Sequence, residues 1–118
     1  MSHKGNEAIA KLLIEKGADI NAQGGYYGNA LQAASHTGHV AIAKLLIYKG
    51  ANVNAQGGYY GNPLQAASYE GHLAIANLLI EKGADVNAQG GYCENALQAA
   101  LYKGHWANAK LLIQKGAL

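Results

Sequence analysis

The apolar positions between residues 73 and 82 follow the period of an α-helix. Ile75, Leu78 and Leu79 stand at positions i, i+3 and i+4 and form an apolar stripe. Polar residues such as Asn77 lie on the other face of the helix, where they can meet water. We therefore predict a helix over 73–82 whose apolar face, Leu78 included, is buried against the rest of the chain.

A shorter helix is predicted directly before it. Asn62 is a favourable N-cap, Pro63 suits the first helical position, and Gln65 completes an Asn-x-x-Gln capping box. Gly71 ends this helix, because glycine adopts the left-handed C-terminal conformation without steric cost. Residues 50–61 are rich in Gly, Asn and Ala and sustain neither the helix nor the strand period, which predicts a loop or hairpin.

This loop-helix-turn-helix unit, residues 50–82, recurs every 33 residues. Residues 17–49 differ from it at 8 of 33 positions, and residues 83–115 form a third copy without insertion or deletion. Residues 1–16 match the second half of a unit and are interpreted as a half repeat or an N-terminal cap, and 116–118 as a tail. Repetition at this period predicts a solenoid of stacked units, one all-α domain over 1–118. The seven expected helices include one near 6–9 and first helices of the units near 30–37, 63–70 and 96–103.

Several motifs at fixed spacing resemble the ankyrin repeat. They are Leu-Gln-Ala-Ala at 64–67, Gly-His at 71–72, Leu-Leu-Ile at 78–80 and Gly-Ala-Asp-Val-Asn-Ala at 83–88. The resemblance covers nearly the whole chain and implies helix-turn-helix units joined by hairpin-like loops. The Gly-Gly-Tyr-Tyr-Gly-Asn-Ala-Leu-Gln-Ala-Ala-Ser run at 24–35 is also similar to the ankyrin arrays of fungal NACHT-type intracellular receptors.

Composition limits the kind of core, the classes of partner and the cellular location that the chain can have. Half of the residues are apolar but none is Phe, so the core must consist of Leu, Ile and small residues packed between units. A net charge of +2 and the absence of Arg disfavour nucleic-acid binding, and no apolar run reaches the ~18 residues of a membrane span. Cys93 is the only cysteine and no Asn-x-Ser/Thr acceptor occurs, which favours a cytoplasmic, reducing location.

Metal and catalytic sites are not expected. Three histidines recur once per unit: His39, His72 and His105. Helices of neighbouring units lie about 8–10 Å apart, too far for these rings to share an ion. The ankyrin resemblance implies instead that each ties a helix end to the neighbouring loop. Only Cys93, Glu94 and Lys103 form a candidate catalytic cluster, and we interpret them as non-catalytic, with no cofactor.

The third unit differs from the others at positions that suggest a cap. Asn108 stands where the other units have Ile42 and Ile75, so we expect Asn108 to face water. Trp106 is expected to cover the end of the stack.

The remaining differences between units suggest a binding surface. They fall mainly on loop tips and first-helix ends, two zones that the ankyrin resemblance places on one concave face. Tyrosine there favours protein recognition, because it offers a large amphipathic surface at low entropic cost. The predicted contact residues are Tyr27, His36, Thr37, Tyr60, Tyr69, Glu70, Cys93, Glu94, Tyr102 and Lys103. The tyrosines that recur in every unit are expected to pack loop against loop: Tyr26, Tyr59 and Tyr92.

The predicted function is therefore a non-catalytic module that binds a protein partner, without nucleic acid or membrane. The alternative is a structural or self-associating spacer within a larger receptor, in which units join end to end. An enzyme or a nucleic-acid binder is a third, weaker hypothesis. A monomer is the expected state.

Overall fold

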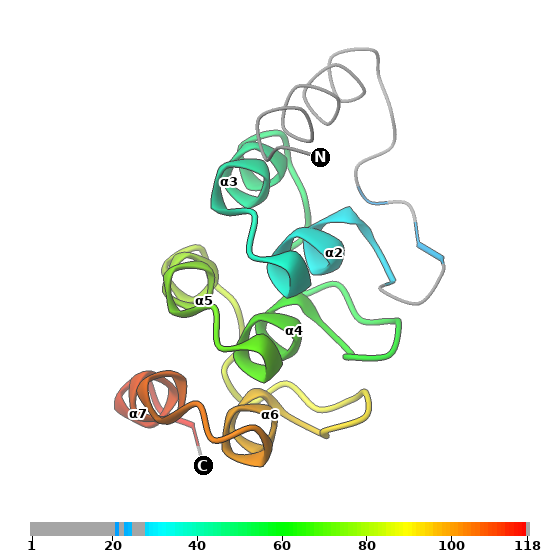
Figure 1. Cartoon of the computed structure of the whole chain (residues 1–118). Helices are drawn as coiled ribbons and strands as arrows, with labels where there is room; N and C mark the ends of the chain where they lie inside the picture. Colours follow the sequence, from blue (N-terminus) through cyan, green and yellow to red (C-terminus); the bar gives the residue numbers. More distant parts are fainter. Residues whose placement is uncertain (1–20, 22, 25–27, 118) are drawn as a thin grey trace.

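The computed structural model describes residues 21, 23–24 and 28–117, in which six helices form three consecutive pairs (Figure 1). The pairs are α2 (Ala30–Thr37) with α3 (Val40–Tyr48), α4 (Pro63–Glu70) with α5 (Leu73–Glu81), and α6 (Ala96–Tyr102) with α7 (Trp106–Gln114). First helices begin at residues 30, 63 and 96, so the 33-residue period is confirmed as a structural repeat. The helix predicted near 6–9 lies outside the described residues.

The helices lie in two layers. The first helices α2, α4 and α6 pack in sequence along one layer, while α3, α5 and α7 form the other. The loops before α4 and α6 project from the side of the first layer (Figure 1). The described residues contain isolated bridges at two loop tips, such as Gly57 with Gly61, but no strand. The all-α solenoid predicted from the repeat is therefore confirmed.

Asparagine begins each first helix, as predicted. Asn62 is extended, and its side-chain oxygen accepts a hydrogen bond from the backbone N–H of Gln65 at 2.9 Å. The second half of the predicted capping box is wrong. The Gln65 side chain does not reach back to the cap, because its Nε2 donates to the carbonyl of Gly90 at 2.8 Å, in the loop of the next unit. Gln32 donates in the same way to Gly57, so this glutamine ties neighbouring units together.

Glycine ends the first helices of the first two units. Gly71 has a left-handed backbone with φ of 75°, as its sequence position predicts. A Cβ there would also lie 2.6 Å from the His105 ring, so close packing requires glycine as well. The predicted tie between histidine and a loop is corrected for His72: its Nε2 donates to the carbonyl of His36, in the preceding unit's first helix, at 2.9 Å.

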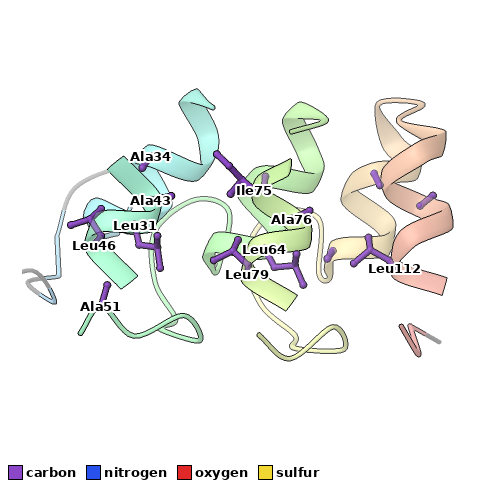
Figure 2. Packing of buried hydrophobic residues seen from close by; sticks show 14 residues of the cluster. Leu31, Ala34, Ala43, Leu46, Ala51, Leu64, Ile75, Ala76, Leu79 and Leu112 are labelled. Atoms are coloured by element: carbon purple, nitrogen blue, oxygen red, sulfur yellow. The ribbon is translucent and has the colours of Figure 1, made fainter. Parts of the chain in front are cut away.

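The core runs along the stack between the layers (Figure 2). Leucines and isoleucines alternate with alanines whose small side chains allow the helices to approach closely. Leu79 is fully buried, with 0% of its surface exposed, whereas Leu78 is only partly buried. The prediction that Leu78 lies in the core is therefore corrected in favour of Leu79.

Two predictions about α7 are wrong. Asn108 is only 2% exposed, although it was expected to face water, and its Nδ2 has no hydrogen-bond partner among the described residues. The helix places this position inward, as it does for Ile75 in α5, whatever its polarity. Trp106, expected to cover the end of the stack, is mostly exposed at the start of the same helix.

An asparagine ladder connects the starts of successive loops, a role that sequence reasoning did not assign. The Asn54 side chain donates to the carbonyl of Gly83 at 3.0 Å and accepts from the backbone N–H of Asp85 at 2.7 Å. Asn21 makes the equivalent pair of contacts one unit earlier. Each rung lies one repeat from the next, so the ladder links every loop to its neighbour at the repeat distance.

Candidate binding surface

Six rings from the three units form one continuous group, which we call the aromatic cluster. Its members are His36, Tyr59, Tyr60, Tyr69, Tyr92 and Tyr102. Tyr60 lies at the centre, with its ring centroid 5.0 Å from those of His36 and Tyr59 and 5.2 Å from that of Tyr69. The cluster therefore joins loop residues to the ends of first helices.

The cluster continues into the third unit through two parallel ring pairs. Tyr59 and Tyr92 stack with centroids 5.0 Å apart and planes 17° apart, and Tyr69 stacks on Tyr102 at 6.1 Å. The backbone N–H of Tyr92 also donates to the carbonyl of Tyr59 at 2.9 Å. The expectation that Tyr59 and Tyr92 pack loop against loop is therefore confirmed, while Tyr26 lies outside the described residues.

Exposure of the rings separates a supporting part from an accessible part. Tyr60 is only 6% exposed, so the prediction that it contacts a partner directly is corrected. Its ring lies on the buried side of the cluster and supports the other rings. The backbone of Gly91, in the next loop, lies so close to that of Tyr60 that a Cβ would not fit between them. Tyr92 and Tyr102, in contrast, are 56% and 65% exposed.

Charged groups lie beside the rings and bridge units. Glu70 Oε1 is 3.3 Å from His36 Nε2, an ion pair when the imidazole is protonated. Lys103 places its Nζ 5.1 Å from the centroid of the Tyr69 ring, within the range of a cation–π contact. Exposed Thr37 follows His36 in the sequence and is the last residue of α2. Of the predicted contact residues, these lie together around the cluster, while Tyr27 lies outside the described residues.

The third unit carries a surface hollow of about 630 Å³ at the edge of the cluster. It is lined by Tyr92, Cys93, Glu94, Gln98, Leu101 and Tyr102. Three of these were predicted contact residues, whereas Tyr92, Gln98 and Leu101 were not. A sequence signal existed for Leu101, which replaces a serine present in both other units. Tyr92 was not predicted as a contact residue, because the same position is tyrosine in every unit and a comparison of the units shows no difference there.

Two ionisable groups in the hollow are held in their neutral forms. Burial raises the pKa of the Cys93 thiol, so the reactive thiolate is disfavoured at neutral pH. Hydrogen bonding with Tyr102 is the largest cause that raises the pKa of Tyr92. The raised pKa of Cys93 gives no sign of an activated nucleophile, and Glu94 supplies the carboxylate among the residues that line the hollow.

The described part of the chain contains neither a candidate metal site nor a candidate membrane span. Residues 21, 23–24 and 28–117 contain no group of three or more His, Cys, Asp or Glu side chains placed to hold a metal ion. None of the helices in that part is long and apolar enough to cross a bilayer.

A match to a known family model identifies the kind of protein to which the chain belongs. The family model for ankyrin repeats (3 copies) matches residues 1–90 of the 118. The chain belongs to the ankyrin-repeat family. Ankyrin repeats have a non-enzymatic fold and generally serve as protein–protein interaction modules. No curated protein matches the sequence as a relative. The narrower resemblance to fungal NACHT-type arrays stays a prediction.

Within this ankyrin stack, the loops and first helices form the layer that carries the aromatic cluster, and the second helices form the opposite layer. Accessible residues at this cluster come from all three units. We call them the tyrosine face, defined as His36, Thr37, Tyr69, Glu70, Tyr92, Cys93, Glu94, Tyr102 and Lys103.

Proposed function

We propose that this ankyrin domain binds a protein partner through the tyrosine face. The observation that supports this most directly is the aromatic cluster, which leaves Tyr92 and Tyr102 more than half exposed although they contact other rings. Exposed aromatic residues that gather in one place are typical of interaction sites rather than of inert surface. The proposal extends the general role of the family to a particular face of this chain.

The ring contacts support tight binding because they restrict the tyrosines before a partner arrives. Tyr102 is held against Tyr69 and Tyr92, and Tyr69 is held against buried Tyr60. A side chain that is already ordered loses less conformational entropy on binding, so more of the contact energy appears as affinity. The buried Tyr60 ring contributes by positioning its neighbours.

The charges beside the rings favour a partner of mixed charge. Glu70 and Lys103 lie on the tyrosine face with opposite signs and belong to different units. Charges at the rim of an interface mainly set orientation and partner choice. We also propose an intracellular location, because Cys93 is unpaired within the chain and the sequence has no N-glycosylation acceptor.

The test combines a random peptide display library with a matched pair of variants. Peptides selected on the domain are measured against Tyr69→Ala with Tyr102→Ala, and against Tyr48→Ala, an exposed tyrosine in the opposite layer. We expect the double variant to weaken binding at least ~30-fold, corresponding to ~2 kcal/mol, and the control to leave it unchanged. Circular dichroism of all three proteins checks that the fold is retained.

Two results would contradict the proposal. Binding that survives the double variant but fails on substitution of Lys44, Tyr48 and Lys49 would place the partner on the second-helix layer. Concentration-dependent oligomers of the wild type that persist in the same double variant would instead favour the self-associating spacer, whose units join end to end. Sedimentation velocity over a range of concentrations distinguishes that outcome.

A further inference from the structure

The third-unit hollow occupies a position that neighbouring loops fill elsewhere in the stack. Gly61, the second unit's equivalent of Glu94, lies so close to the next loop that a Cβ would be 2.8 Å from the backbone carbon of Gly90. Gly28 is packed in the same way, with a Cβ there 2.9 Å from the backbone carbon of Gly57. A glutamate at this position is therefore incompatible with the loop packing that the other two units show, and its side chain lies at an open hollow.

Glu94 also adopts a backbone conformation that disfavours its side chain. Its φ is 74°, and it is the one non-glycine residue with positive φ in the described part of the chain. Gly28 and Gly61 adopt the same region with φ of 86° and 88°, which glycine does without steric cost. A strained residue at the edge of a surface hollow is the kind of outlier that points to function.

The lining of the hollow combines aromatic walls with one negative charge. The rings of Tyr92 and Tyr102 stand 89° apart with centroids 6.3 Å from each other, and Leu101 adds an exposed apolar surface. Glu94 supplies the carboxylate, whereas the raised pKa of Cys93 keeps its thiol uncharged. Lys103 lies over the Tyr69 ring and is not among the lining residues, so the chain's own nearby cation does not occupy the hollow.

We propose that the third-unit hollow binds a lysine or arginine side chain of the partner protein. Its cationic head would pair with the Glu94 carboxylate, and its aliphatic stem would lie against Tyr92, Tyr102 and Leu101. Charge complementarity and the affinity of cations for tyrosine rings both favour this occupant over an acidic or purely apolar residue. The inference rests on the proposed function, because it names the anchor that the tyrosine face recognises.

The test uses the same random peptide library, selected separately on wild type, Glu94→Gln and Glu94→Lys. We expect a Lys or Arg at one fixed position among peptides selected on the wild type, no such preference with Glu94→Gln, and Asp or Glu at that position with Glu94→Lys. Glu81→Gln is the matched control, since Glu81 is an exposed glutamate in the second-helix layer, and should retain the wild-type preference.

A double-mutant cycle on the best peptide isolates the contact. Replacing its cationic residue by Ala should weaken binding about tenfold or more to the wild type but hardly at all to Glu94→Gln. Peptides that lack a cationic position, yet lose binding on Tyr69→Ala with Tyr102→Ala, would overturn this inference and leave the proposed function standing. Peptides that bind the double variant as tightly as the wild type would overturn the proposed function itself. So would a selection that yields no binder.

Discussion

Replacing Leu79 by Ala is expected to destabilise the whole stack. Leu79 is fully buried in α5, and α5 contacts the second helices on both sides, α3 and α7, as well as α4. The substitution removes three carbon groups, which forfeits about 2.4 kcal/mol at ~0.8 kcal/mol for each. The helices are held in place by inter-unit hydrogen bonds and cannot fully close the cavity, so we expect a total loss of about 3–5 kcal/mol.

Leu78→Ala is the matched control, because it removes the same atoms from the next position of the same helix. Leu78 is partly buried and lines a groove on the surface between α3 and α5. Its truncation should leave no enclosed cavity and cost only about 1 kcal/mol, since much of its surface already meets water. The original expectation, which placed Leu78 and Leu79 on the same buried stripe, predicts a loss of ~2–5 kcal/mol for Leu78→Ala as well.

Urea unfolding followed by far-UV circular dichroism measures both losses. In a three-unit stack the central unit is coupled to both neighbours, so the Leu79 variant should lose stability in a single transition. A loss of 3 kcal/mol should also lower the melting temperature by roughly 10 °C in a chain of this size. Equal losses for the two variants, or a larger loss for Leu78→Ala, would refute the burial argument.

Three further predictions concern the third unit. Glu94→Gly should raise the free energy of unfolding by about 0.5–1 kcal/mol, because glycine relieves the positive φ; a lower urea midpoint would show that the glutamate makes compensating contacts in the free protein. Asn108→Ile should stabilise by about 1–3 kcal/mol, because it removes a buried, unpaired Nδ2 and restores the residue of the other units; an unchanged melting temperature would contradict this. Tyr102→Phe should lower the pKa of Tyr92, measured by tyrosinate absorbance during an alkaline titration, and an unshifted titration would count against their hydrogen bond. Because that bond raises the pKa of Tyr92 above its ordinary value of 10.0, any stability it contributes is present below that pH and is lost as the pH rises through the raised pKa.

Local patterns predicted the elements well. Helices Ala30–Thr37 and Pro63–Glu70 have the expected bounds, and the N-cap Asn62 and the C-cap Gly71 act as expected. These features depend on residues within one or two helical turns, so sequence neighbours suffice to predict them. The repeat added a further constraint, because agreement among three copies establishes the register of each unit.

The candidate site was predicted in part, from differences between otherwise similar units. That comparison found residues at its edges, including Tyr69 and Tyr102, but not Tyr92, which occupies a position that is tyrosine in every unit. It also could not distinguish a supporting ring from an exposed one. Tyr60 is buried by a loop that lies about one repeat further along the chain, a contact that no local pattern encodes.

The sequence alone determined the repeat, the family, the helices and their caps, because these follow from periodicity and short-range hydrogen bonding. Tertiary structure decided which side of each apolar stripe is covered, and therefore that Leu79 rather than Leu78 is buried. It also decided that Gln65 binds the next loop instead of its own helix cap. In a solenoid a core residue meets atoms about 33 positions away, so its burial depends on how neighbouring units pack, and that packing is a property of the stack rather than of any one unit.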